Sequence, residues 1–382
     1  MAYERDNIAR LTAYVPGEQP QAGRWIKLNT NENPYPPAPA VLQAIRKVSA
    51  DQLRRYPPPH ADVFCAVAAK LHKVNPQQII ATNGGDELLR LMVTVFARPN
   101  LAVHPSQREA IEEAGPGGIA VAEPSYSLYP VLADIQESSV CRIPLQDDWS
   151  LPVDFAQRAI KAGCKLAMIV NPHAPSGYVE PLDRLRELAL ELAKGGCVLL
   201  IDEAYANFAK NDCLSLVRKG SGLDNVILLR SLSKGYSLAG LRFGYGIGHP
   251  DLIASLNKAK DSYPTDILAQ AAAQAALQSQ TYARLTWRKV ISERTRMTRL
   301  LQKQGWQVAP SGSNFILAAP PQGMAASADH SGVPAARAIY HALKDQSIFV
   351  RYFDQDRLRD KLRITIGTPA QNNRLLRALQ RI

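Results

Sequence analysis

Short apolar runs alternate with longer segments of helical periodicity from about residue 78 onward. The runs cover residues 79–81, 119–121, 166–170, 198–201 and 226–229. Each is typical of a strand that is buried on both faces. Between two of these runs, leucines recur at helical spacing over 182–192. The alternation predicts an α/β fold with a mostly parallel central sheet that is flanked by helices.

The two ends of the chain have different patterns. Residues 11–40 are rich in Pro, Gly and Asn, which predicts an extended arm, and residues 264–301 have the periodicity of one long helix. After residue 305 the pattern becomes mixed, which indicates a smaller α+β domain with strands near 314–317, 349–350 and 362–366. The expected division is an amino-terminal arm over 1–40, a large domain over 41–265 and a small C-terminal domain over 266–382. Residues 98–118 have the composition of an inserted surface segment, and 319–334 that of a loop.

Polar clusters follow each of the five predicted strands. They lie at 83–87, 123–126, 171–177, 202–205 and 231–234. In an open parallel sheet, ligands bind beyond the carboxyl ends of the strands. The five clusters are therefore expected to meet at one site.

Composition narrows the class of protein but does not decide it. The 382 residues carry 45 Lys and Arg against 34 Asp and Glu, a net charge of +11. This balance fits a nucleic-acid-binding protein or an enzyme that handles phosphates and carboxylates, and the basic residues are dispersed. Five scattered cysteines without a C-x-x-C pair favour a reducing, cytoplasmic setting and give no metal-site spacing. No signal peptide and no membrane-spanning run is recognisable.

Two of the polar clusters have both a functional and an ordinary interpretation. The glycines at 84–85 open a predicted helix and suit a phosphate, although a plain helix start explains them equally well. Asp202 ends an apolar strand, where a carboxylate needs a cation or a hydrogen-bond donor. It either holds a protonated ring nitrogen or caps the next turn, and Tyr205 follows three residues later.

Basic residues allow the same two interpretations. Lys234 is either one surface lysine among many or a buried nucleophile toward carbonyls, and its neighbours Ser231, Ser233 and Arg242 favour the second. Arg351 and Arg363 each lie near a predicted strand of the small domain. They suit a carboxylate or phosphate, or form surface ion pairs with nearby aspartates.

Taken together, four motifs of this chain resemble those of fold-type I pyridoxal-phosphate aminotransferases. The motifs are DEAY at 202–205, SLSK at 231–234, AGLR at 239–242 and LRITIG at 362–367, and they occur in the order of that family. LTAYVPGEQP at 11–20 and LNTNENPYPP at 28–37 are similar to the histidinol-phosphate aminotransferase branch. The resemblance covers about residues 8–370.

The resemblance implies a role for each matching residue. Lys234 would form the covalent imine with pyridoxal 5′-phosphate, Asp202 would pair with the pyridinium nitrogen, and Tyr205 would donate to the 3-oxygen. The remaining cofactor contacts would be Gly85, Asp86, Tyr126, Ser231, Ser233, Arg242 and, from a partner subunit, Tyr56. Substrate contacts would be Tyr14, Asn33, Arg351 and Arg363. The implied reaction is transamination of histidinol phosphate with 2-oxoglutarate in histidine biosynthesis by a homodimer with shared active sites, without nucleic acid or membrane as partner.

The sequence departs from the family pattern at one position of the expected site. Members usually read N-N-P-[TS]-G where this chain has HAPSG at 173–177, so Ala174 replaces the asparagine that contacts the 3-oxygen. His173 and Asn171 are the candidates to compensate. Three other functions stay open: an aromatic amino acid aminotransferase, a threonine-phosphate decarboxylase of the same fold, and a non-catalytic nucleic-acid-binding protein.

Overall fold

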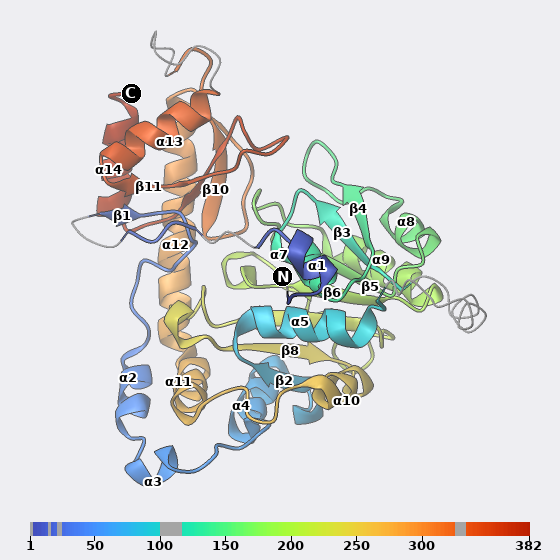
Figure 1. Cartoon of the computed structure of the whole chain (residues 1–382). Coiled ribbons are helices and arrows are strands. Elements are labelled where there is room, and N and C mark those ends of the chain that lie inside the picture. Colours follow the sequence, from blue (N-terminus) through green and yellow to red (C-terminus); the bar gives the residue numbers. More distant parts are fainter. Residues whose placement is uncertain (1–2, 14–16, 21–24, 100–116, 325–333) are drawn as a thin grey trace.

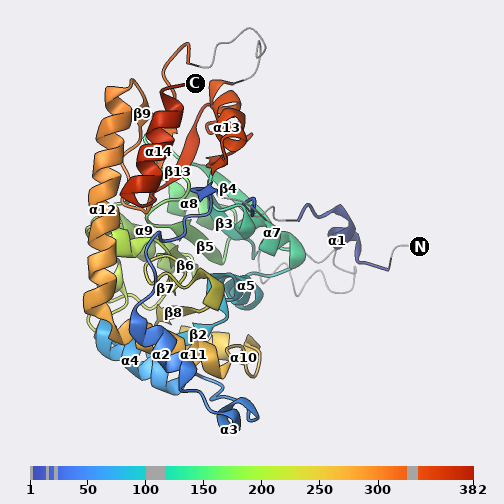
Figure 2. The ribbon, with the colours of Figure 1, turned by 90° about the vertical axis from the view of Figure 1, so that its left-hand side faces the viewer.

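The computed structural model describes residues 3–13, 17–20, 25–99, 117–324 and 334–382. A large sheet with helices on both faces lies beside a smaller layer of sheet and helices, and one long helix runs along both (Figures 1 and 2). The strands of the large sheet are β2 (Ile79–Thr82), β3 (Ile119–Glu123), β4 (Val140–Pro144), β5 (Leu166–Val170), β6 (Val198–Asp202), β7 (Val226–Ser231) and β8 (Gly244–Gly248).

The large sheet has the strand order β2-β8-β7-β6-β5-β3-β4. Strands β3 to β7 pair in parallel, whereas β8 runs antiparallel to both of its neighbours, β2 and β7. Strands β5 and β7 are buried throughout and β6 is buried except at Val198, as their apolar runs predicted. The expectation of a mostly parallel sheet flanked by helices is therefore confirmed.

Strand β8 escaped prediction because its sequence, GYGIG, is rich in glycine, which is unfavourable in strands. The structure shows why glycine is needed here. A Cβ on Gly244 would lie 2.7 Å from the backbone carbon of Gly84, and one on Gly248 would lie 2.9 Å from the Ile227 side chain. The close approach at Gly244 brings β8 against the start of the helix that follows β2.

Helices pack on both faces of the large sheet. One apolar cluster includes Phe64, Leu185 and Ala272, and a second cluster on the other face includes Leu88 and Leu256. The helices associated with this sheet are α2 (Pro39–Arg46), α3 (Ala50–Leu53), α4 (Asp62–His72), α5 (Gly84–Phe96), α7 (Leu128–Ile135), α8 (Phe155–Lys161), α9 (Leu182–Lys194), α10 (Pro250–Ala259) and α11 (Ile267–Gln278). Short 3-10 turns cover Pro76–Gln78, Ala206–Phe208, Leu214–Leu216 and Ala239–Leu241.

The second layer is built around a four-stranded antiparallel sheet in the order β12-β13-β10-β9. Its strands are β9 (Gln307–Val308), β10 (Phe315–Ala319), β12 (Arg351–Tyr352) and β13 (Leu362–Thr365). The helices α12 (Gln280–Lys303), α13 (Ala335–Asp345) and α14 (Pro369–Leu379) contribute to its apolar cluster, which contains Met297, Ile339 and Leu375. This is the smaller α+β part that the mixed pattern predicted.

The amino-terminal segment is more ordered than an extended arm. Helix α1 (Asp6–Arg10) contacts α7, where Asn7 Nδ2 donates to the carbonyl of Asp134. Strand β1 (Ile26–Lys27) then pairs in parallel with β11 (Ile348–Phe349). The amino-terminal segment therefore reaches the second layer before the chain enters the large sheet.

Four sequence expectations change or stay open. The single long helix expected over 264–301 is wrong, because α11 and α12 are separate helices that meet at Ser279, whose ψ of 40° is not helical. Most of the expected inserted segment, 100–116, lies outside the described residues, as does 325–333 of the loop expected over 319–334. The domain boundaries at residues 40 and 265 stay a prediction.

In the part of the chain that the structure describes, no helix is long and apolar enough to span a membrane.

Candidate active site

A cavity of about 240 Å³ lies beyond the carboxyl ends of the parallel strands, between the large sheet and the β12-β13 edge of the second layer. Loops after β2, β3, β5, β6 and β7 contribute to its walls, as the convergence of polar clusters predicted. Eleven of the sequence-predicted residues line it: Gly85, Asp86, Tyr126, Asp202, Tyr205, Ser231, Ser233, Lys234, Arg242, Arg351 and Arg363.

One end of the cavity is formed by the start of α5 and the segment after β7. The first backbone N–H groups of a helix are unpaired and attract anions. Two hydroxyls, of Ser231 and Ser233, lie at the same end, and Arg242 Nη1 is 3.5 Å from Ser233 Oγ. A Cβ on Gly84, whose φ is +77°, would lie 2.7 Å from Arg242 Nη2. Glycine at 84 therefore lets the guanidinium approach the helix start.

Asp86 lies at the same end and connects two other predicted residues. Its carboxylate accepts from Arg242 Nη2 at 3.3 Å and from the Tyr126 hydroxyl at 3.4 Å. The Tyr126 ring in turn meets the edge of Tyr129, with ring centroids 5.5 Å apart. These contacts hold an aromatic face and a guanidinium beside the helix start.

Asp202 is the last residue of β6 and is 6% exposed. Its carboxylate accepts from the Tyr129 hydroxyl at 3.1 Å and from the Ala204 N–H at 2.9 Å. Burial raises the pKa of this carboxyl to about 6, more than the two donors lower it. A buried carboxylate at the cavity wall is stabilised by a cation, such as a protonated ring nitrogen.

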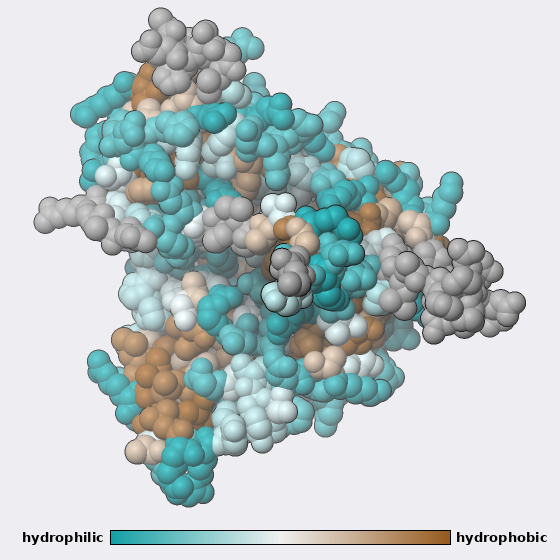
Figure 3. Space-filling model, viewed as in Figure 1, coloured by the Kyte–Doolittle hydropathy of each residue, from teal (hydrophilic) through white to brown (hydrophobic). Residues whose placement is uncertain are grey.

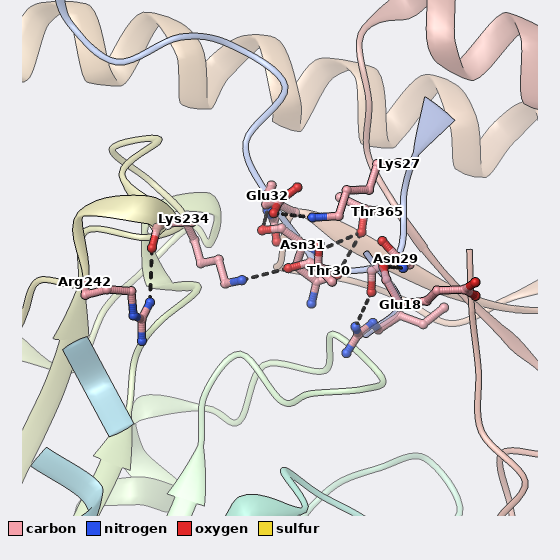
Figure 4. A network of polar contacts seen from close by, with 12 residues as sticks. Glu18, Lys27, Asn29, Thr30, Asn31, Glu32, Lys234, Arg242 and Thr365 are labelled. Atoms are coloured by element: carbon pink, nitrogen blue, oxygen red, sulfur yellow. Dashed lines mark hydrogen bonds and ion pairs between the residues drawn. The ribbon is translucent and has the colours of Figure 1, made fainter. Parts of the chain in front are cut away.

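Lys234 projects into the space between the helix start and the second layer (Figure 4). Its ammonium donates to the Thr30 carbonyl at 2.8 Å. Burial, together with the positive charges of Arg363 and Arg242, lowers the pKa of Lys234 to about 8. A lysine of this pKa is partly neutral near physiological pH and can act as a nucleophile or a base.

Tyr205 lies beside Ala174 at the cavity wall. The Tyr205 ring packs with Val170, Ala174 and Phe315, and its hydroxyl accepts from Asn31 Nδ2 at 3.0 Å. Asn31 belongs to the amino-terminal segment and was not among the predicted site residues.

The two residues expected to compensate for Ala174 point elsewhere. His173 Nε2 lies 3.0 Å from the carbonyl of Pro124 and its Nδ1 lies 2.7 Å from Ser176 Oγ. Asn171 Oδ1 accepts from the Glu180 N–H at 2.9 Å, and its Nδ2 lies 3.7 Å from Cys213 Sγ. Neither residue lines the cavity, so this part of the expectation is wrong. Both side chains instead fix the loop that carries Ala174.

Arg351 and Arg363 face each other across the antiparallel pair β12-β13. Like charges directly opposite on neighbouring strands are destabilising. Both guanidinium groups nevertheless line the cavity, stacked near the ring of Phe353 at 5.2 and 5.4 Å. Arg363 Nη2 also donates to the Asn29 carbonyl at 2.9 Å. This pair is a suitable binding place for a carboxylate or a phosphate monoester.

Three predicted residues are not among those that line the cavity. Asn33 uses its side-chain oxygen for the Tyr35 N–H at 3.1 Å and its amide for the Gly235 carbonyl at 3.4 Å. Tyr56 is 80% exposed between α3 and α4 and stacks on Tyr263 at 4.4 Å. Tyr14 lies outside the described residues. No group of three or more His, Cys, Asp or Glu side chains suited to a metal was found among the described residues.

Three further residues of the site were not singled out from the sequence. Tyr129 binds Asp202 from α7, Thr30 accepts from Lys234, and Asn31 binds Tyr205. Thr30 and Asn31 lie in the polar NTNENP stretch, which is their sequence signal, but the resemblance implied a role there for Asn33. Tyr129 had no such signal, because a buried tyrosine on an apolar helix is indistinguishable from a packing residue.

Comparisons with known proteins agree with this geometry. Residues 23–379 match the family model of class I and II aminotransferases. The chain is 41% identical over 380 residues to histidinol-phosphate aminotransferase 1 of Trichormus variabilis, covering 99% of this chain and 98% of the relative. It is 40% identical over 382 residues to histidinol-phosphate aminotransferase of Geobacter sp. (strain M21), covering 99% and 98%.

A solved structure resembles the whole chain. The crystal structure of histidinol-phosphate aminotransferase from Sinorhizobium meliloti in complex with pyridoxal-5'-phosphate has a TM-score of 0.82 and 26% identity, and covers 100% of this chain and 97% of that one. The family model matches far more than half of the chain, and the relatives align with nearly all of it. The chain therefore belongs to the class I and II aminotransferases and, within them, to the histidinol-phosphate aminotransferase family.

Proposed function

We propose that this chain binds pyridoxal 5′-phosphate and transfers the amino group of histidinol phosphate to 2-oxoglutarate, which gives imidazole-acetol phosphate and glutamate in histidine biosynthesis. One observation carries the proposal. Lys234, with a pKa near 8, lies in a cavity that has an anion cradle at one end and a pair of cross-strand arginines at the other. The names of the relatives support the choice of substrate.

The cavity fits the cofactor at both of the cofactor's polar ends. The start of α5, with Ser231, Ser233 and Arg242, would hold the phosphate, and the glycines at 84 and 85 leave room for it. The buried Asp202 would hold the protonated ring nitrogen, and Tyr126 would cover the ring. When bound, the ring accepts the electron pair that the substrate's Cα–H bond leaves behind.

In this proposal, Lys234 has two tasks. It holds the cofactor covalently until the substrate amine takes its place, and its freed amine then moves the proton from the substrate's Cα. Both tasks need a neutral amine, which burial and the two nearby arginines favour at neutral pH. The Thr30 carbonyl, 2.8 Å from Nζ, orients the side chain.

Arg351 and Arg363 would bind the anionic end of each substrate. A guanidinium binds two oxygens of either a phosphate or a carboxylate, so one pair can serve both histidinol phosphate and 2-oxoglutarate. We also propose Tyr14 and Asn33 as residues on the substrate side.

The experiment combines covalent trapping with a substrate panel. Borohydride reduction of the protein loaded with pyridoxal 5′-phosphate should attach the cofactor's mass to Lys234, as seen by peptide mass spectrometry. Lys234→Ala should lose this attachment and all turnover, while Lys258→Ala, on the exposed side of α10, should keep both. An active Lys234→Ala protein would contradict the proposal.

The panel separates the rival functions. Histidinol phosphate should be transaminated with a far higher kcat/KM than phenylalanine or tyrosine. A preference for free aromatic amino acids would indicate an aromatic aminotransferase, and release of carbon dioxide from threonine phosphate would indicate a decarboxylase. Salt-sensitive retention on DNA without turnover would indicate the nucleic-acid-binding alternative.

We further propose a homodimer with shared active sites in the cytoplasm. Exposed large apolar side chains lie on α2, α4, α11 and α12, among them Leu42, Val63, Leu268 and Leu285. Figure 3 shows hydrophobic surface gathered over the α2 and α11 region. A patch of this kind is typical of a surface that a second copy covers. Tyr56 is exposed and precedes α4, one of the helices that carry the patch. In the dimer it would reach the phosphate end of the partner's cavity. The five cysteines are free, which suits a reducing compartment.

A further inference from the structure

Three consecutive residues of the amino-terminal segment each contact a different functional group. Figure 4 shows two of these residues beside the site, with Lys234 pointing at Thr30 and Asn31 bonded to Thr365. The Asn29 carbonyl accepts from Arg363 Nη2 at 2.9 Å, and the Thr30 carbonyl accepts from Lys234 Nζ at 2.8 Å. Asn31 Nδ2 donates to the Tyr205 hydroxyl at 3.0 Å. The first two contacts use the backbone, which any residue provides. Only the third depends on the identity of the side chain.

Asn31 is fixed in place by its own surroundings. It is 1% exposed, and its φ of 57° lies in the left-handed region that asparagine tolerates better than most residues. Its backbone N–H donates to Thr365 Oγ1 at 3.0 Å, and its carbonyl accepts from Asn314 Nδ2 at 2.8 Å. The Thr365 hydroxyl donates to Asn31 Oδ1 at 2.9 Å. Because Oδ1 is occupied by Thr365, the amide N–H is directed at Tyr205.

The ring of Tyr205 has apolar neighbours. It packs with Val170, Ala174 and Phe315, and Ala174 has no polar side-chain atom. His173 and Asn171, on the same loop, are bonded away from the cavity. Asn31, from the amino-terminal segment, donates to the Tyr205 hydroxyl, whereas His173 and Asn171 do not line the cavity.

We propose that Asn31 is the positioning residue of Tyr205. Its amide N–H donates into the hydroxyl oxygen, so the hydroxyl's own proton is directed to the group bound in the cavity. A hydroxyl that accepts one hydrogen bond donates a stronger one, so the Asn31 amide also strengthens the hydrogen bond that the Tyr205 hydroxyl donates. The inference rests on the proposed function, in which Tyr205 donates to the ring oxygen of the cofactor.

The consequence is a spectroscopic one. A hydrogen bond to an ionised oxygen favours the ionised form and lowers the pH at which it forms. The ionised oxygen here is the ring oxygen of the cofactor, to which Tyr205 would donate. Without the Asn31 donor, the absorption spectrum of the protein loaded with pyridoxal 5′-phosphate should therefore change at a higher pH. The loss of one hydrogen bond of ordinary strength should raise the pH of this spectral transition by about 0.5 to 1 unit.

The test compares two substitutions that differ in one property. Asn31→Asp keeps the shape and the acceptor for Thr365 but replaces the donor to Tyr205 with a second acceptor, which draws the tyrosine's proton away from the cavity. Asn31→Ala removes both contacts. The spectral transition should move to higher pH in both variants, and further in Asn31→Asp. Asn225→Ala, which removes a buried asparagine that donates to two carbonyls elsewhere, should leave the transition where it is.

A rescue variant separates positioning from general structural damage. In Asn31→Ala combined with Ala174→Asn, the new amide comes from the loop after β5, where Ala174 packs with Tyr205, and should bring the transition back toward its original pH. An unchanged transition in Asn31→Asp would overturn the inference. This variant decides the question even if Asn31→Ala does not fold. The proposed function is tested separately, because borohydride trapping on Lys234 in the unaltered protein does not depend on Asn31.

Discussion

At the scale of single residues, the site depends on burial that changes the chemistry of ordinary side chains. Lys234 and Asp202 both lie where the charged form of the side chain is costly. Burial lowers the pKa of Lys234 to about 8 and raises that of Asp202 to about 6. Each residue is thus held closer to neutrality than it would be in water. In the proposed function, the ring nitrogen would stabilise Asp202 and covalent attachment would keep Lys234 uncharged.

The pH dependence of Lys234 can be measured without the cofactor. Burial and two positive neighbours both disfavour the ammonium, so the amine should become neutral and reactive as the pH rises through about 8. In the ligand-free protein, reductive methylation of Lys234, followed by peptide mass spectrometry, should have its midpoint there. Arg363→Gln should move the midpoint upward, because it removes one of the charges that lower the pKa.

The control for this measurement is Arg377→Gln, on the exposed side of α14, which should leave the midpoint unchanged. A midpoint of the unaltered protein at the ordinary pKa of a lysine, which is about 10.4, would mean that neither burial nor the arginines destabilise the ammonium of Lys234.

At the scale of elements, the antiparallel pair β12-β13 places two arginines directly opposite each other. Such a pair costs stability by itself, and a bound dianion or dicarboxylate relieves the repulsion. The register of two short strands therefore decides the anion specificity that we propose for the cavity.

Replacing either arginine should affect both substrates. In Arg351→Gln and in Arg363→Gln, KM should rise roughly 10- to 100-fold for histidinol phosphate and for 2-oxoglutarate alike, because each loses one charge-assisted hydrogen bond. Steady-state kinetics with each substrate varied in turn measures this. Arg359→Gln, whose guanidinium is paired with Asp356, serves as the control with unchanged KM values. A rise for one substrate alone would mean that the two anions use different partners.

Secondary structure was predictable from the sequence where local pattern and tertiary environment agree. The five apolar runs became β2, β3, β5, β6 and β7, because a strand buried on both faces needs apolar side chains throughout. The pattern failed at β8, where glycines are required by the close approach of Gly84 and Ile227. It failed again at Ser279, because the helical periodicity continues across this residue although the flanking residues belong to two helices.

At the scale of the whole molecule, the amino-terminal segment joins the two sheet layers. It packs on α7 through Asn7, pairs with β11 through β1, and then places residues 29–31 over the cavity. Through Thr365, on the same strand as Arg363, this segment also meets the arginine pair. The arm thus contributes to the site within its own subunit, in addition to any contact with a second one.

The shared site of the proposed dimer can be tested by mixing two impaired variants. Lys234→Ala and Tyr56→Phe would each impair both sites of their homodimers. In a mixed dimer, the site built on the Tyr56→Phe subunit keeps its own Lys234 and receives an intact Tyr56 from the other subunit. The Lys234→Ala and Tyr56→Phe proteins are unfolded together and refolded to form mixed dimers. The activity of this mixture per intact Lys234 should exceed that of the Tyr56→Phe homodimer.

The unaltered homodimer, unfolded and refolded in the same way, gives the reference value for an intact pairing. If activity after mixing equals the sum of the two separate homodimers, Tyr56 acts within its own subunit or not at all. Size-exclusion chromatography before and after mixing checks that dimers are compared with dimers.

The sequence by itself determined the sheet's apolar strands and the order of the polar clusters, because these depend on local composition and spacing. The class of cofactor chemistry followed from the resemblance of its motifs to a known family. The tertiary structure alone decided which residues meet across large separations. Arg351 and Arg363 became opposite neighbours through strand register, and Asn31 reached Tyr205, 174 positions away, through the path of the amino-terminal segment. It also turned His173 and Asn171 away from the cavity, because their hydrogen bonds to Pro124 and Glu180 are satisfied there. Such contacts depend on how the chain closes on itself, which no local pattern records.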